Sequence, residues 1–398
     1  MELEYYFTPA KFSVERVFGG DADIRLGNNI ALFDSKSNIT LEDFDVAVIG
    51  IEKCANSKTG SGCAKAPGAI RSKLYGLSGL ARELKIVDLG NINGKTIKDK
   101  YIVLKEVTAY LIKNSVIPLV IGGGQDYTIP MADALSSKGE EWSLSIIDSK
   151  IDYIKESRKA DSANFLKKVL SDNKQHINSV TLLGVQKYLY SSGQEQLVNS
   201  NYFNLLRLGE IRDEAIKKAE PYLRDADLLS IDVAAVKSSD MPAQAGAMPN
   251  GLFSNEICQL AHYAGLSDKL KAFGLFELAP GFDSNFESGV FLSAQIVWHF
   301  LEGVSARHND FPVRDIESYS MFIVHLEDYE VDIRFFNNTQ NGRWWVEVPD
   351  EDNSSIISCC KQDYDEAIKN IIPEKWIISV KKSSSISGSK KNSFTDSD

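Results

Sequence analysis

Acidic side chains lie at the ends of several apolar runs that read as β-strands. Asp148 and Asp152 close one run, Asp232 closes another and Glu277 closes a third. Ligands of parallel α/β sheets bind beyond the carboxyl ends of the strands, so these carboxylates would converge on one cleft. Taken singly, each reads as an ordinary strand-end residue. Together they predict a cation site, because neighbouring carboxylates repel one another and are rarely kept together without a metal ion or a basic partner.

The strands and helices that must position these carboxylates alternate regularly along the chain. From about residue 44 to 302, short β-rich apolar runs alternate with amphipathic helical stretches such as Ser254–Ala264, which is typical of parallel βαβ units. The runs expected to be strands are Phe44–Ile51, Leu84–Leu89, Ile117–Ile121, Ser143–Asp148, Val180–Val185, Tyr202–Leu208, Asp227–Val233 and Lys271–Leu278. We therefore predict a three-layer αβα sandwich around an eight-stranded, mainly parallel sheet.

Three strand ends carry most of the polar residues. They are Gly122–Asp126 (GGGQD), Asp148–Asp152 (DSKID) and Ser230–Ala234 (SIDVA), the last followed by Ser239-Asp240-Met241-Pro242. None of the five histidines falls in these motifs, and no Ser-His-Asp order emerges. The glycines at 122–124 do not form GxGxxG and lack a P-loop lysine, so phosphate binding is not indicated.

These strand ends resemble the ureohydrolase superfamily of arginase, agmatinase and, most closely, formimidoylglutamase. The resemblance covers roughly residues 44–302 and is carried by the three strand-end motifs together with Gly62–Arg71 (GCAKAPGAIR) and Phe276–Pro280 (FELAP). It implies an arginase-like fold and hydrolysis of C–N bonds in guanidino or formimino groups. It also implies two manganese ions held by histidine and aspartate ligands, with Glu277 as the glutamate on the substrate side.

The ligand positions that the resemblance implies are only partly filled by metal-binding residues. Carried over by position, they are Gln125, Asp148, Lys150, Asp152, Asp232 and Ala234. The amide oxygen of Gln125 is a weak ligand, the ammonium group of Lys150 has no lone pair and repels a cation, and Ala234 offers only a methyl group. The residual ligands would be Asp148, Asp152 and Asp232, and we expect no bound cofactor, with Mn²⁺ or another divalent cation as the alternative.

Three functions are compatible with these departures. We favour the first, a catalytically silent, degenerate member of the family that binds a protein or a small molecule. The alternative is a metal-dependent hydrolase of C–N bonds in linear amidines, such as formimidoylglutamate or guanidino compounds, with a residual cation on the three aspartates. The third is a purely structural subunit of a larger assembly.

The strand–helix alternation stops after Gly303. Strands are expected at Met321–His325, Val331–Phe336 and Arg343–Val348, and a helix near Gln362–Asn370. The adjacent Trp344 and Trp345 would point to opposite faces of a strand, so one indole would pack inward and its neighbour would face outward; a partner-binding anchor is the alternative. We divide the chain into an N-terminal segment (1–43), a ureohydrolase-like domain (44–304), a β-rich extension (305–380) that offers a partner-binding surface, and a serine-rich disordered tail (381–398).

The composition limits the partners. A formal charge of −11 disfavours nucleic acid and anionic membranes, and no apolar run is long enough to span a bilayer. The five cysteines form no CxxC pair, so we expect reduced, packed thiols and a cytoplasmic location. Because relatives commonly form trimers or hexamers, a homo-oligomer is expected by analogy alone.

Overall fold

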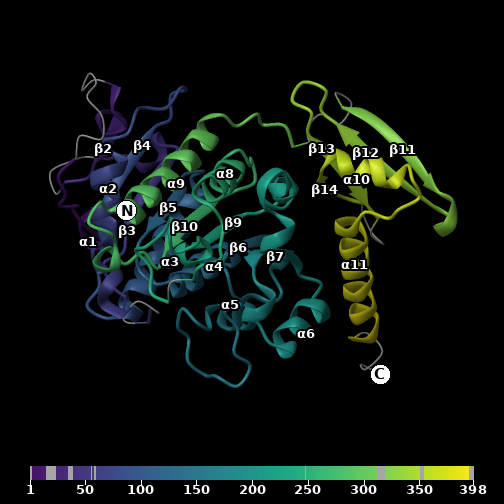
Figure 1. Ribbon diagram of the computed structural model, residues 1–398, viewed down its shortest axis with the longest axis horizontal. Coiled ribbons are helices and arrows are strands. Elements are labelled where there is room, and N and C mark those ends of the chain that lie inside the picture. The colour runs from purple at the N-terminus through teal and green to yellow at the C-terminus, as the bar shows by residue number, and fades with distance from the viewer. Residues whose placement is uncertain are drawn as a thin grey trace. The chain divides into compact units, whose positions relative to one another are not determined.

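The computed structural model describes residues 2–14, 24–34, 39–54, 56–57, 60–246, 248–311, 319–349 and 354–393. The chain forms two compact units. The first contains residues 1–190 and 206–307, and the second contains residues 191–205 and 308–398 (Figure 1). No helix in the described part of the chain is long and apolar enough to cross a membrane.

A ten-stranded sheet forms the centre of the first unit. Its strands are β1 (Phe7–Thr8), β2 (Ile30–Leu32), β3 (Val46–Gly50), β4 (Ile86–Ile92), β5 (Ile117–Ile121), β6 (Trp142–Ile147), β7 (Ile177–Val185), β8 (Asn204–Arg207, at the boundary of the two units in the chain), β9 (Leu228–Asp232) and β10 (Ala272–Phe276). They follow the order β1-β4-β3-β5-β10-β9-β6-β7-β8, and β2 pairs with β4. The pairings of β3, β5, β6, β9 and β10 with one another are parallel.

All eight strands predicted for this region are present, but the predicted sheet was too small. The N-terminal segment adds β1, which is antiparallel to β4, and β2, which is parallel to it. These two strands contain only two and three residues, so they are too short for an alternating pattern to show in the sequence. Their position is set by pairing with β4 rather than by local propensity.

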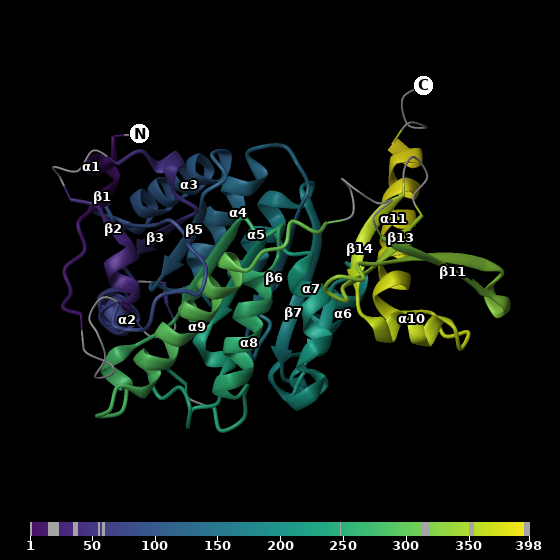
Figure 2. The same cartoon turned by 90° about the horizontal axis from the view of Figure 1, so that it is seen from above.

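Helices cover both faces of the sheet (Figure 2). One face carries α2 (Ala66–Leu74), α7 (Glu220–Arg224), α8 (Ser254–Gly265) and α9 (Ser288–Ser305), and the other carries α3 (Ile97–Lys113), α4 (Thr128–Ser136) and α5 (Phe165–Asn173). A short helix, α1 (Leu3–Tyr6), precedes β1. The three-layer αβα architecture is therefore confirmed.

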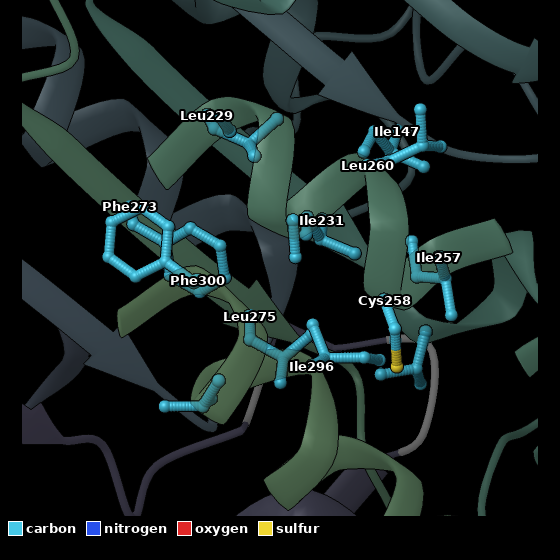
Figure 3. Close-up of a cluster of buried hydrophobic side chains, with 14 of the residues drawn as sticks. Ile147, Leu229, Ile231, Ile257, Cys258, Leu260, Phe273, Leu275, Ile296 and Phe300 are labelled. Atoms are coloured by element: carbon cyan, nitrogen blue, oxygen red, sulfur yellow. The ribbon is translucent and has the colours of Figure 1, made fainter. Parts of the chain in front are cut away.

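The hydrophobic core between the sheet and helices α8 and α9 determines the face of the sheet to which the polar side chains of β9 point. Figure 3 shows buried side chains of β9 and β10 packed against those two helices, among them Leu229, Ile231, Phe273, Leu275, Leu260 and Phe300. The rings of Phe273 and Phe300 stack with their centroids 4.2 Å apart. Side chains alternate along a strand, so Ser230 and Asp232 of β9 point to the opposite face, toward α4.

The strand register brings the polar ends together. In the parallel pair of β6 and β9, Ile147 lies opposite Ile231, so the next residues, Asp148 and Asp232, emerge side by side. In the pair of β9 and β10, Phe276 lies opposite Asp232, and Glu277 follows directly. The convergence that the sequence predicted therefore follows from parallel pairing.

The second unit contains an antiparallel sheet in the order β11-β12-β13-β14. Its elements are α6 (Ser192–Ser200), β11 (Ser320–Leu326), β12 (Val331–Asn337), β13 (Trp344–Val348), β14 (Ser355–Cys359), α10 (Lys361–Ala367) and α11 (Glu374–Ser393). The sequence did not predict β14. Trp344 and Trp345 are only 8% and 0% exposed, so both indoles are packing residues in this structure.

Helix α11 includes residues that the sequence suggested would be disordered. It continues to Ser393, whereas residues 394–398 lie outside the described part of the chain. Its first turns are anchored, because Trp376 Nε1 donates to the Glu347 carbonyl (2.8 Å) and Lys375 Nζ donates to the Ser358 carbonyl (2.7 Å). Once such a nucleus is fixed, each further helical residue costs little, even in a serine-rich segment.

Candidate cation site

Three buried carboxylates meet beyond the ends of β6 and β9. Asp148, Asp152 and Asp232, called the aspartate triad below, are 1%, 7% and 0% exposed. One oxygen from each lies within 4.8 Å of the other two. Among the described residues this is the one cluster of potential ligands tight enough to hold a metal ion. Buried like charges at this spacing are expected to repel strongly unless a positive charge joins them.

Backbone N–H groups orient two members of the triad. The N–H of Lys150 donates to Asp148 Oδ1 (3.2 Å), and the N–H of Ala234 donates to Asp232 Oδ1 (2.8 Å). The Ser149 hydroxyl adds a 3.3 Å hydrogen bond to the same Asp148 oxygen. Lys150 and Ala234 thus lie beside the triad, as their motifs predicted, but they contact it through the main chain. No ion pair between the Lys150 ammonium group and a described carboxylate is present.

Gln125 is also brought to the site. It is fully buried in the short 3₁₀ helix Gln125–Tyr127, which follows β5. Its Nε2 donates to Ser230 Oγ (3.2 Å), and Ser230 in turn bonds Thr128 Oγ1 (2.7 Å). Ser230 lies two residues before Asp232, on the same face of β9, so the Gln125 amide lies on the triad side of the sheet. Its Oε1 has no hydrogen-bond partner within the described residues.

Glu277 lies outside the triad, and its carboxylate is bonded to Gln125 and Ser57. Glu277 Oε1 accepts a hydrogen bond from the Gln125 backbone N–H (3.0 Å), and Oε2 accepts one from the Ser57 hydroxyl (2.5 Å). Its backbone φ is +66°, a left-handed conformation that is uncommon for a residue with a side chain. The carboxylate is therefore held in a defined orientation beside the triad, which suits a group that receives a ligand.

The sequence interpretation missed Asp126 as a site residue, although it belongs to GGGQD. It is 1% exposed, and its Oδ2 accepts a hydrogen bond from the Tyr101 hydroxyl. Burial raises the pKa of Asp126 to about 6; the Tyr101 hydrogen bond opposes this rise, and the charge of Glu277 adds to it. Ser57 was missed as well, and it lies in a loop without any motif. Asp240, by contrast, bonds the Ser254 N–H (3.0 Å) at the start of α8, away from the triad.

The loop that carries Ser57 is closed by a disulfide bond, which corrects the expectation that all cysteines are reduced. Cys54 and Cys63 are bonded, with their Cα atoms 6.0 Å apart and a sequence separation of nine. This spacing is not CxxC, so no sequence motif indicated the pairing. Cys258, Cys359 and Cys360 are free thiols. The cytoplasmic location stays a prediction.

The residues present fit a divalent cation. Three carboxylates supply the anionic oxygen donors that divalent cations require, so the expectation of no cofactor is not supported. The positions that would complete a second ligand set are Lys150 and Ala234, and neither side chain can donate an electron pair to a metal at neutral pH. The prediction that these positions are degenerate stays a prediction.

Comparison with known proteins assigns the class. The profile of the Arginase family matches residues 44–302. Formimidoylglutamase of Bacillus subtilis (strain 168) is 21% identical over 278 residues, which is 65% of this chain and 86% of that protein. The chain therefore belongs to the arginase family.

Solved structures show the same fold. The crystal structure of Trypanosoma cruzi formiminoglutamase with Mn²⁺ has a TM-score of 0.62 at 22% identity and covers 69% of this chain and 97% of that one. The formimidoylglutamase structure from Bacillus subtilis has a TM-score of 0.63 at 20% identity, covering 73% and 95%. Proclavaminate amidino hydrolase from Streptomyces clavuligerus has a TM-score of 0.58 at 19% identity, covering 67% and 93%.

Proposed function

We propose that this protein is a metal-dependent hydrolase of C–N bonds in linear amidines, a class that includes formimidoylglutamate and guanidino compounds. The observation that carries the proposal is the aspartate triad, buried and within 4.8 Å, at the strand ends of an arginase-family fold. The names of the relatives, formimidoylglutamase and an amidino hydrolase, support the same class of reaction. We therefore favour this hydrolase over the catalytically silent family member that the sequence had suggested.

The chain's own residues supply the binding and orienting groups. The triad would hold the cation, which when bound supplies Lewis acidity that polarises the substrate and lowers the pKa of water. Glu277, fixed by Ser57 and by the Gln125 N–H, offers its carboxylate to the N–H groups of a cationic amidine. The buried surroundings strengthen both interactions because they exclude water.

The experiment is a turnover assay with a matched inactive variant. Ammonia, urea and formamide release would be measured from formimidoylglutamate, arginine and agmatine, with added Mn²⁺ and with EDTA. We expect Mn²⁺-dependent product that disappears in Asp232→Asn, which keeps the carbonyl that accepts the Ala234 N–H. Product release that is no higher than that of Asp232→Asn with every substrate would rule the hydrolase out.

A binding role without catalysis is the second candidate, and one feature of the second unit favours it. Among the described residues, strand β11 is an edge of its sheet and pairs with β12 alone. Met321 and Ile323 on this strand are each 56% exposed, which is unusual for an edge strand. We propose that an extended apolar segment of a partner adds to this edge. Ile323→Lys should then abolish capture of that partner, and unchanged capture would rule this surface out.

A further inference from the structure

We infer that the site binds one hard divalent cation rather than two, with an oxygen-only ligand set that includes the amide oxygen of Gln125. This deepens the proposed function, since it rests on a cation being used at that site. It concerns the number of ions and the nature of the ligands, which the family assignment leaves open for this chain.

The first step is the position of the Gln125 amide. Its nitrogen end is fixed by the Ser230 hydroxyl, and its backbone N–H is bonded to Glu277. The side chain is fully buried, and its Oε1 has no hydrogen-bond partner among the described residues. Buried carbonyl oxygens nearly always have a partner, and an unpaired one costs free energy. A cation on the adjacent aspartate triad would satisfy this oxygen.

A partnerless amide oxygen alone is not sufficient evidence, and Gln244 shows why. Gln244 is also buried, its Nε2 donates to the carbonyls of Val236 (2.9 Å) and Met241 (2.7 Å), and its Oε1 likewise has no partner in the described part of the chain. What distinguishes Gln125 is its neighbour, because Ser230 shares a strand face with Asp232. Gln244 is therefore the matched control.

The second step concerns the place of a second ion. Lys150 and Ala234 occupy the ligand positions of a second ion. Their backbone N–H groups bond Asp148 Oδ1 and Asp232 Oδ1. A hydrogen-bonded carboxylate oxygen is a poorer metal ligand, and neither side chain adds a donor. The half-buried ammonium group of Lys150 adds a positive charge that repels another cation. Both effects oppose the binding of a second ion.

The donor set also limits which ion is bound. Carboxylate and carbonyl oxygens suit Mg²⁺, Ca²⁺ and Mn²⁺, whereas the described residues bring no imidazole or thiolate into the cluster. The probe is Mn²⁺, because its electron paramagnetic resonance spectrum separates an isolated ion from an exchange-coupled pair. Neither the titration nor the spectrum requires turnover.

The test is a Mn²⁺ titration of the full-length protein by calorimetry, with the spectrum of the loaded protein. We expect one ion per chain and the hyperfine pattern of an isolated Mn²⁺. Gln125→Ala should weaken binding on the order of tenfold, and Gln125→Glu, which adds charge to the ligand set, should tighten it. Gln244→Ala and Gln244→Glu should leave the affinity unchanged. A merely structural role for Gln125 would make both of its substitutions weaken binding.

The outcomes separate this inference from the proposed function. Two ions per chain with an exchange-coupled spectrum, no Mn²⁺ binding, or equal weakening by Gln125→Ala and Gln125→Glu would each overturn the inference. One bound ion without turnover would support the inference and defeat the hydrolase. Lys150→His combined with Ala234→Asp should raise the number of ions from one to two; if it stays at one, the two residues are not what excludes the second ion.

Discussion

Two buried clusters of charged residues in the first unit differ in whether they combine positive with negative charges or carry negative charges alone. In one, the guanidinium of Arg71 meets the carboxylate of Asp88 in two hydrogen bonds (2.7 and 2.8 Å) and also donates to Asn91 and to the Gly90 carbonyl. The Tyr75 hydroxyl and the Gly90 N–H complete the set on Asp88. In the other, the aspartate triad gathers three buried carboxylates whose oxygens lie within 4.8 Å of one another.

The difference distinguishes a structural cluster from a ligand site. Arg71 and Asp88 are 0% and 1% exposed, carry opposite charges and satisfy each other, so they fix α2 against β4 and need no ligand. The triad is equally buried but carries charge of one sign, which folding alone does not favour. Removing a residue should therefore have opposite effects in the two clusters.

The largest effect is expected at Arg71. Arg71→Ala leaves Asp88 and Asn91 buried without their donor, so the free energy of unfolding should fall by about 3–5 kcal/mol. Urea denaturation followed by circular dichroism would measure this. Arg71→Lys keeps the charge but loses the paired geometry and should lie between Arg71→Ala and the natural protein. A loss below about 1 kcal/mol for Arg71→Ala would show that the pair contributes little.

A somewhat smaller effect of opposite sign is expected at Asp126, beside the triad. Its pKa is raised to about 6, so the folded state holds its proton at pH values where the unfolded chain has released it. Stability contributed by this group therefore falls as pH rises from about 4 to about 6 and stays low above that range. Asp126→Asn should gain roughly 3 kcal/mol at pH 8 and little at pH 4, because one pKa unit corresponds to 1.36 kcal/mol.

The control for this pH dependence is Tyr101→Phe. The Tyr101 hydroxyl stabilises the charged form of Asp126, so its removal should raise the pKa of Asp126 further and steepen the loss of stability above pH 6. Denaturation series at pH 4, 6 and 8 compare the three proteins. A pH profile that Asp126→Asn leaves unchanged would show that another group dominates.

The triad should respond to a cation where the Arg71 cluster does not. At a Mn²⁺ concentration one hundred times the dissociation constant, binding stabilises the folded state by about 2.7 kcal/mol. Asp232→Asn removes one of three like charges, so without cation it should leave stability unchanged or raise it, and it should abolish the response to Mn²⁺. If Asp232→Asn destabilises the cation-free protein as strongly as Arg71→Ala does, the two clusters are equivalent and the comparison fails.

Local patterns were enough to predict the central strands and the triad. Alternation of strands and helices indicates a parallel sheet, and parallel pairing places Asp148 and Asp232 at one edge. Contacts between distant segments were not predictable. Ser57 bonds Glu277 across 220 positions in sequence number, and its loop carries no motif. Gln125 was recognised only as a lost ligand, because an amide's hydrogen-bond partners depend on neighbouring strands.

The short strands and the burial of both tryptophans were also not predicted from the sequence. β1 and β2 are too short for a pattern, and β14 contains only five residues. One of the two adjacent tryptophans was expected to face outward, and this was wrong, because both indoles are buried. These elements depend on pairing and burial against partners that composition does not specify.

A modest effect is expected from the disulfide bond that closes the Ser57 loop. Cys54 and Cys63 enclose a short loop, so reduction should cost about 2 kcal/mol through the entropy of the unfolded chain. The double substitution Cys54→Ser with Cys63→Ser should lower stability by the same amount without reductant. Dithiothreitol should then have no further effect on that variant. If dithiothreitol still destabilises the double variant, another thiol is responsible.

The smallest effect is expected at the end of α11, in the second unit. Trp376 and Lys375 anchor the first turns of the helix, and Ile377 and Val380 pack against the same core. Residues 381–398 carry two apolar side chains, Ile386 and Phe394, so deleting them removes too little apolar area to matter. Truncation after Val380 should leave the melting temperature unchanged, whereas truncation after Glu374 removes Trp376 and should lower it by several degrees. An equal drop for both would show that the end of the helix packs onto the protein and carries stability of its own.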